Sequence, residues 1–303
     1  MRDRLLSLVD LTRPGLEIGA LDHPMVERSM GPVEYVDRAA TPELRRWAQP
    51  HTDVAAIVEV DHVWGDQTLA ECVGKRGGYA YVLTSHVIEH VPDLYGWLGE
   101  IAEVLEPGGV GGFIVPDKRY TFDAPRRTST PAEMVEAYVR RLRRPSPRQV
   151  FDHHFSFRDA ENTTEPDPKR ILEVARLAHD GEYVDSHCWV FTPRTLLAGL
   201  DMASRLDVLP FEIVALEGTP PGSHEFLLAL RRLPDELTAA ERREAFRASA
   251  ERLDLPDEVD ASWPSAAGAD PQAALARLAA IEASTSWRIT APLRAAVNLL
   301  RGH

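Results

Sequence analysis

The chain has 303 residues, of which 44% are apolar, and a formal net charge of −13. This length suits one large α/β domain with additions, and the apolar content can fill a sizeable core. The negative charge argues against a broad nucleic-acid interface, because phosphate binding depends on clustered Lys and Arg.

The sequence also indicates a cytoplasmic protein. Its two cysteines, Cys72 and Cys188, lack the C-x-x-C spacing of metal sites, so we expect free thiols in a reducing compartment. The amino terminus is too short and too charged for a signal peptide. Because no stretch reaches the ~18 apolar residues of a membrane span, we expect no transmembrane segment.

Two short strands near the amino terminus each carry a carboxylate near their end. Residues 16–22 read LEIGALD, in which Glu17 precedes Gly19. A glycine there lets a ligand approach the backbone, although a plain strand-to-turn transition would read the same way. The next strand, 33–37, ends at Asp37, 20 residues after Glu17. Dinucleotide sites place an acid at about this interval on ribose hydroxyls; a cap for the following turn is the alternative.

A third strand is expected over residues 56–60, followed by Asp61 and His62. In open α/β sheets, ligands bind outside the carboxyl ends of the strands, so polar residues that follow an apolar strand are candidate binding residues. Asp61 is such a candidate, and a solvated loop acid is the competing interpretation.

The segment 81–109, YVLTSHVIEHVPDLYGWLGEIAEVLEPGG, couples a buried strand, a polar strand end and an amphipathic helix. Asp93 is predicted to cap this helix, and the PGG sequence ends it before a strand over 110–115. The order strand, helix, strand favours a right-handed parallel crossover. The polar residues at the strand end are Ser85, His86, Glu89 and His90.

A long insertion, 116–190, follows the fifth strand and is expected to cover a substrate. Helices are predicted in it over 130–143 and near 168–179. Strands over 211–217 and 225–231, joined by a turn-rich connection, are predicted to form a hairpin that completes the sheet.

Beyond Leu233 the composition shifts towards Ala, Arg and Glu. Thr238 and Glu241 form a capping box that opens a helix to about Leu253, and a second helix is expected over 270–281. These helices could pack on their own domain or form the contact of a homodimer.

The order of these elements, with the sequence HVIEHVPD at 86–93, resembles class I S-adenosylmethionine-dependent methyltransferases from about Gly15 to Arg232. The resemblance implies an α/β, Rossmann-like fold: a mostly parallel seven-stranded sheet with an antiparallel terminal hairpin, a mixed insertion after strand 5 and a C-terminal helical extension. Residues 1–233 would be the methyltransferase domain, including the 116–190 insertion, and 234–303 the extension. The first motif departs from the family, since Ala20-Leu21-Asp22 stands where further glycine is usual.

The resemblance also implies S-adenosylmethionine as the cofactor. Asp37 would bind its ribose, and Asp61 would lie near the adenine amino group, with Val63 or Trp64 flanking the ring. The residues assigned to the cofactor are Glu17, Gly19, Ala20, Asp37, Asp61, His62, Ser85 and His86.

Methyl transfer from a sulfonium is an in-line displacement, so the enzyme must align donor and acceptor and, for a hydroxyl, remove a proton. His154 and His153 are the leading candidate bases, and Asp117, directly after the fifth strand, is the next. Adjacent histidines in a loop are also common as structural residues. Asp185 and His187, with His153 or His154, could hold a divalent metal ion, which is possible but not predicted.

Segments 116–123 and 284–294 resemble parts of methyltransferases and other proteins that accompany bacterial glycan assembly. This resemblance favours O-methylation of a sugar, a glycan or a glycosylated metabolite, with a small-molecule or glycan acceptor and no nucleic-acid partner. Two alternatives stay open: N- or C-methylation of a small natural product, and a catalytically degenerate fold that only binds.

Overall fold

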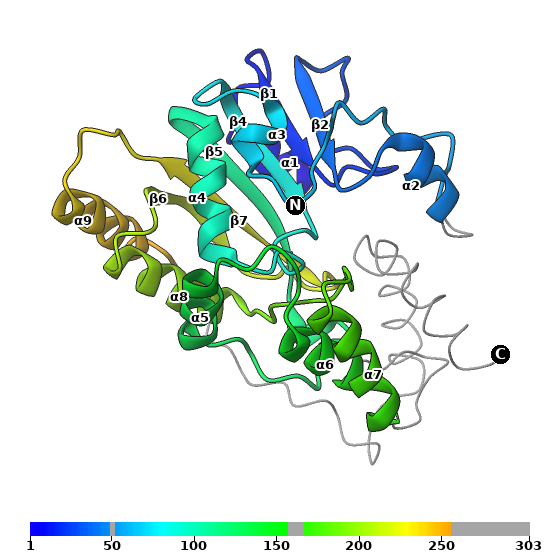
Figure 1. The fold of residues 1–303 in the computed structure, drawn as a ribbon. Helices are drawn as coiled ribbons and strands as arrows, with labels where there is room; N and C mark the ends of the chain where they lie inside the picture. The colour runs from blue at the N-terminus through cyan, green and yellow to red at the C-terminus, as the bar shows by residue number, and fades with distance from the viewer. Residues whose placement is uncertain (49–51, 157–166, 256–303) are drawn as a thin grey trace.

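The computed structural model describes residues 1–48, 52–156 and 167–255, which form a seven-stranded sheet covered by helices (Figure 1). The strands are β1 (Gly15–Ile18), β2 (Val33–Asp37), β3 (His62–Val63), β4 (Tyr79–Ser85), β5 (Leu105–Pro116), β6 (Phe211–Glu217) and β7 (Glu225–Arg232). The α-helices are α1 (Arg2–Leu6), α2 (Thr41–Trp47), α3 (Leu69–Val73), α4 (Leu94–Val104), α5 (Pro131–Arg140), α6 (Pro147–Ser156), α7 (Pro168–His179), α8 (Pro193–Arg205) and α9 (Ala239–Ala250). No helix within the described ranges has the length and apolar character needed to cross a membrane.

The strands lie in the order β3-β2-β1-β4-β5-β7-β6, and β7 runs in the direction opposite to the other six strands. The Rossmann-like sheet with an antiparallel terminal hairpin is therefore confirmed. Because β1 lies beside β4, the strand order reverses between the two halves of the sheet. Ligands of open α/β sheets bind at such a switch point, outside the carboxyl ends of the strands.

The prediction of a third strand over 56–60 is wrong. The third strand is His62–Val63, which pairs with Val36 and Asp37 of β2. Upstream of it, Ile57 is buried in another way, since it packs in a small cluster with Leu44 of α2. At this point of the chain, the apolar character of a residue indicates that its side chain is buried. It does not indicate that the backbone pairs in the sheet.

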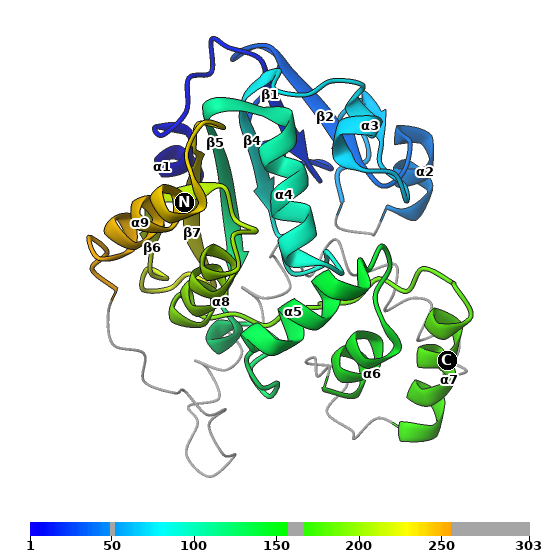
Figure 2. The ribbon, with the colours of Figure 1, turned by 60° about the vertical axis from the view of Figure 1, so that its left-hand side comes forward.

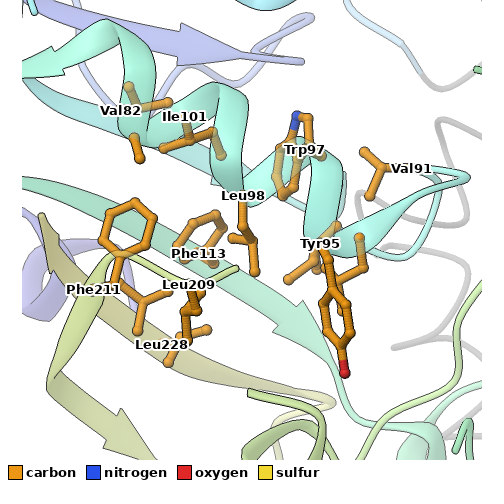
Figure 3. Close-up of a cluster of buried hydrophobic side chains, with 14 of the residues drawn as sticks. Val82, Val91, Tyr95, Trp97, Leu98, Ile101, Phe113, Leu209, Phe211 and Leu228 are labelled. Carbon is orange, nitrogen blue, oxygen red and sulfur yellow. The ribbon is translucent and has the colours of Figure 1, made fainter. Parts of the chain in front are cut away.

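The two faces of the sheet carry separate hydrophobic clusters. On one face, α4 lies along the sheet, with Leu98 and Ile101 towards Phe113 of β5 and Phe211 of β6 (Figure 3). On the other face, Leu5 of α1 packs among residues of β2, β4, β5 and β7. Both faces are apolar because a mostly parallel sheet is covered on both sides.

The insertion contains α5, α6 and α7, and Figure 2 shows these helices together at one end of the sheet. It meets the carboxyl end of β4, because the backbone carbonyl of Glu89 accepts hydrogen bonds from Cys188 N at 2.6 Å and Trp189 N at 3.2 Å. The two predicted helices are present as α5 and α7. His153 and His154, expected in a loop, lie in α6.

Helix α9 begins at the predicted capping box, in which Thr238 and Glu241 satisfy each other's backbone N–H groups. It packs against β6, with Phe246 buried and the Ser249 hydroxyl accepting a hydrogen bond from Ile213 N at 2.9 Å. The helix predicted over 270–281 and the segment 284–294 lie outside the described residues.

Candidate active site

A cavity of about 400 Å³ lies at the switch point of the sheet. Its first side, here called the donor side, is lined by the strand-end residues Gly19, Asp37 and His86. A second part of the lining, here called the far side, comes from α4 and from the insertion, including the end of α5, Tyr183 and Asp185. The volume is within the range of about 300–1,000 Å³ that is typical of small-molecule sites.

The donor side has unusual backbone geometry directly after β1 and directly after β4. Gly19 has φ +75°, and two non-glycine residues, Leu21 at φ 47° and His86 at φ 54°, also occupy the left-handed region. A Cβ atom on Gly19 would lie 2.7 Å from Cγ2 of Val87, a separation that real Cβ contacts do not reach. Such conformations cluster at functional sites, and at Gly19 the absence of a side chain is a steric requirement.

Gly19→Ala is expected to lower the free energy of unfolding by about 1–2 kcal/mol, because alanine is strained in the left-handed region and its Cβ would contact Val87. Urea denaturation measures the change. Gly99→Ala is the matched control: Gly99 lies in α4 with open space around its Cβ, so alanine there should stabilise the helix by about 1 kcal/mol. Equal stability of Gly19→Ala and wild type would contradict the steric argument.

Asp37 presents a half-buried carboxylate to the cavity at the end of β2. Burial raises its pKa to about 6, and the backbone N–H bonds from Arg38 and Ala39 offset this only in part. The guanidinium of Arg38 lies 5.1 Å from the ring centroid of Trp47 and 5.1 Å from that of Tyr183. Arg38 therefore connects α2 to the insertion across the cavity wall through cation–π contacts.

The remaining residues that the sequence assigned to the cofactor do not line the cavity. Ala20 and Ser85 are beside residues that do. Glu17 is buried, and its carboxylate accepts hydrogen bonds from Met25 N at 2.7 Å and Val26 N at 2.9 Å. Burial raises the pKa of Glu17 to about 7. Through these two hydrogen bonds, the side chain of Glu17 holds the loop that follows β1 in place.

Asp61 and His62 are also engaged away from the cavity. Asp61 precedes β3, and its carboxylate accepts from Tyr35 N and from Arg28, each at 2.7 Å. The His62 ring pairs with Glu34 at 2.8 Å. The residues after β3 that line the cavity are Trp64 and Gly65.

The three residues assigned to catalysis lie off the cavity wall, so their role stays a prediction. The carboxylate of Asp117 is fully buried, where it pairs with Arg119 at 2.6 Å and accepts a hydrogen bond from the Thr219 hydroxyl at 2.7 Å. His153 and His154 are buried in α6. Burial, with the neighbouring His154 and His187, lowers the pKa of His153 well below its usual value.

A pair that was not assigned to the site, His90 and Asp185, does line the cavity. His90 Nδ1 lies 2.9 Å from Asp185 Oδ1, which also accepts a hydrogen bond from the Tyr183 hydroxyl at 3.1 Å. Burial alone would lower the pKa of His90, but the carboxylates of Asp185 and Glu89 outweigh it and raise the pKa to about 9. Both residues belong to polar segments visible in the sequence, whereas their pairing across 95 positions depends on the fold.

A buried ion-pair network holds the insertion around this pair. Arg126 is 3% exposed and donates to Asp123 Oδ1 at 2.7 Å, to Asp152 Oδ2 at 2.6 Å and to the backbone carbonyl of His187 at 2.9 Å. The other oxygen of Asp123 lies 2.5 Å from His187 Nδ1. The network therefore fixes the segment that carries Asp185.

The residues of the donor side fit S-adenosylmethionine. At Gly19 a ligand can approach the backbone, where a larger residue would be strained. Asp37 offers carboxylate oxygens that can accept hydrogen bonds from ribose hydroxyls, and Trp64 offers a ring for adenine. When bound, this cofactor supplies an electrophilic methyl group on a sulfonium.

The sequence matches a family described as "Methyltransferase domain" over residues 2–200. The comparison with curated proteins finds no match. Among solved structures, a methyltransferase from Mesorhizobium loti is 16% identical, with 76% of this chain and 96% of that chain covered, at a TM-score of 0.41. One from Methanosarcina mazei is 13% identical, with 77% and 98% covered, at a TM-score of 0.42.

A methyltransferase from Listeria monocytogenes is likewise 13% identical, with 77% of this chain and 97% of that chain covered, at a TM-score of 0.40. These likenesses concern the fold alone, whereas the family match extends over most of the chain and includes the donor side of the cavity. The chain therefore belongs to the methyltransferase-domain family and is a class I S-adenosylmethionine-dependent methyltransferase.

Proposed function

We propose that this enzyme methylates a hydroxyl group of a sugar, a glycan or a glycosylated metabolite. The observation that carries the proposal is the lining of the far side, which combines the exposed aromatic rings of Tyr138 and Tyr183 with the carboxylate of Asp185. Aromatic rings can cover the apolar face of a sugar, and a carboxylate accepts hydrogen bonds from its hydroxyls. A few polar groups in a largely apolar cavity are what orient a small ligand.

Asp185 is the residue that we assign to the acceptor hydroxyl. Its Oδ1 is held by His90 and Tyr183, while no hydrogen bond to Oδ2 is present among the described residues. Burial would raise the pKa of Asp185, but His90 beside it lowers the pKa below its ordinary value. Such a carboxylate is a weak base towards a free hydroxyl. The hydroxyl proton becomes strongly acidic as the new carbon–oxygen bond forms, and Asp185 can accept it at that stage.

Asp37→Ala is expected to weaken the binding of S-adenosylhomocysteine by about 1–3 kcal/mol at pH 7.5, through the loss of hydrogen bonds to ribose. The pKa of Asp37 is about 6, so the wild-type affinity should fall as the pH drops below about 6 and the carboxylate is protonated. The variant should lack this dependence. Calorimetric titration between pH 5 and about 8 measures both effects.

Asp61→Asn is the matched control for Asp37, because Asp61 does not line the cavity and asparagine keeps an acceptor for Tyr35 N. We expect its affinity to equal that of wild type. An unchanged affinity of Asp37→Ala would remove Asp37 from the donor site, and a loss in Asp61→Asn would restore Asp61 to it.

Product analysis tests the acceptor class. The full chain is incubated with methyl-labelled S-adenosylmethionine and a panel of sugars, nucleotide sugars and glycosylated metabolites, and the methylated atom is located by NMR. A methyl ether on a sugar carbon would support the proposal. Methylation on nitrogen or carbon only, or cofactor binding without transfer to any member of the panel, would contradict it.

A further inference from the structure

We propose that the acceptor carries an anionic group, a carboxylate or a phosphate, and that the guanidinium of Arg38 binds this group in the cavity. The inference rests on the proposed function, because it assigns the part of the acceptor that lies beside the methylated hydroxyl. It narrows the acceptor to acidic sugars, which are sugar acids and phosphorylated sugars, either free or within a larger glycosylated molecule.

The side chain of Arg38 has hydrogen-bond donors that the protein does not use. Arg38 is exposed and lines the cavity, and its guanidinium makes no hydrogen bond or ion pair with any residue that the structure describes. A guanidinium offers five N–H donors in one plane. The cavity-lining Arg143, in contrast, is paired with Glu100. The donors of Arg38 are therefore available to a ligand in the cavity.

Two aromatic rings hold this guanidinium in place. Its central carbon lies 5.1 Å from the ring centroid of Trp47 in α2 and 5.1 Å from that of Tyr183 in the insertion. These contacts attract the cation without accepting a hydrogen bond from it. An arginine that is already held loses less side-chain freedom when a ligand binds. Its planar fork matches the paired oxygens of a carboxylate or a phosphate, so the site favours an oxyanion.

Arg38 lies close to the group that we assign to the acceptor hydroxyl. Tyr183 contacts both, because its ring faces Arg38 and its hydroxyl donates a hydrogen bond to Asp185 Oδ1 at 3.1 Å. Burial would raise the pKa of Asp185, but His90 and, to a smaller extent, Arg38 lower it below its ordinary value. One six-membered ring with one exocyclic oxygen thus separates the cation from the carboxylate. A single sugar residue can therefore contact both groups at once.

The charges of the two groups select one orientation of such an acceptor. The ionised carboxylate of Asp185 repels an anion and accepts a hydrogen bond from a hydroxyl, whereas Arg38 attracts the anion. An acidic sugar would therefore bind with its charged group at Arg38 and a hydroxyl at Asp185. The opposite orientation would bring two negative charges together, which is the kind of penalty that gives a site specificity.

Arg141 is the competing position for the anion. It is exposed, lines the cavity at the end of α5, and makes no hydrogen bond or ion pair with a described residue. Within the described ranges, however, no aromatic ring holds its guanidinium, and no contact links it to Asp185. Arg38 is preferred because Tyr183 provides both of these features for it.

The first test uses the full wild-type chain saturated with S-adenosylhomocysteine. Calorimetric titrations compare methyl glycosides of glucose and galactose that differ only at C6, where they carry a hydroxymethyl group, a carboxylate or a phosphate. An acidic member should bind about 10–100-fold more tightly than its neutral counterpart, and this preference should fall as the salt concentration rises. The two acidic forms decide between carboxylate and phosphate. Equal affinities, or no binding of any member, would overturn the proposal.

The second test uses variants of the arginines. Arg38→Gln should remove the preference, so that acidic sugars bind about 10–100-fold more weakly and neutral sugars bind as they do to wild type. Arg38→Lys should restore part of it, because lysine keeps the charge without the planar fork. Arg46→Gln is the matched control, since Arg46 is 71% exposed in α2 and does not line the cavity. Melting temperatures establish that each variant is folded.

Three outcomes for the variants would contradict the role of Arg38. Equal losses for neutral and acidic sugars in Arg38→Gln would mean that Arg38 only holds the cavity wall through Trp47 and Tyr183. A loss of preference in Arg141→Gln alone would move the anion to the end of α5. A lower affinity for S-adenosylhomocysteine with an unchanged preference would assign Arg38 to the carboxylate of the donor.

The titrations need no methyl transfer, so their outcome is independent of the proposed function. If acidic sugars bind through Arg38 and product analysis finds methyl groups only on nitrogen or carbon, the anion site is supported and the proposed O-methylation fails. If sugar hydroxyls are methylated without a preference for acidic acceptors, the proposed function is supported and the inference about Arg38 fails.

Discussion

Asp185→Asn is expected to lower turnover by about 10²–10⁴-fold while leaving the affinity for S-adenosylhomocysteine close to that of wild type. Asparagine keeps an acceptor for His90 and Tyr183, so the local arrangement should persist. It cannot take up a proton from the acceptor. A loss confined to turnover is the signature of a group that acts in the transition state and not in donor binding.

Single-turnover kinetics on an identified acceptor, with calorimetry for the donor, measures the two quantities separately. Asp180→Asn is a suitable control, because Asp180 is an exposed acid of the same insertion at the end of α7. His154→Ala is the competing variant, since the sequence favours His154 as the base. If His154→Ala loses turnover and Asp185→Asn does not, the proton acceptor lies in α6.

Arg126→Met is expected to lower the free energy of unfolding by about 3–5 kcal/mol, the cost typical of breaking a buried ion pair from one side. Methionine has a similar length but leaves the buried carboxylate of Asp123 with the His187 ring as its remaining side-chain hydrogen-bond partner among the described residues. It also removes the hydrogen bond to the carbonyl of His187. The segment that carries Asp185 should therefore loosen together with the fold.

Chemical denaturation followed by fluorescence measures this loss. The adjacent Arg127 provides the matched control, because its side chain is 74% exposed and pairs with Glu133 at 2.9 Å. Exposed pairs of this kind contribute about 0–1 kcal/mol, so Arg127→Met should be nearly neutral. Similar losses in both variants would show that the burial of Arg126 is not the cause.

Much of the fold could be predicted from local signals. Helix α7 is preceded by Asp167, whose side chain caps it, and has Pro168 in its first turn; Thr130 and Glu133 form the capping box of α5. Such signals are physical requirements of helix ends and are visible in sequence. The third strand is predicted at the wrong place because Ile57, the buried residue of 56–60, packs against Leu44 of α2 and does not pair in the sheet.

The candidate site was predicted less completely, for a different reason. Gly19, Asp37 and His86 line the cavity, and the sequence places them there because strand ends meet at the switch point of the sheet. Glu17 has the same sequence signal, but its carboxylate turns towards the backbone N–H groups of the following loop. The pairing of His90 with Asp185 depends on how the insertion folds back, which local periodicity does not encode.

The two sides of the cavity come from different stretches of the chain. The donor side is formed by strand ends, and much of the far side is formed by the insertion, including the end of α5. Under the function proposed above, substitutions between β5 and β6 change the acceptor site and leave the strand ends assigned to the methyl donor as they are. Related enzymes with this arrangement can evolve new acceptors through substitutions in one contiguous segment, while selection acts separately on the strand ends.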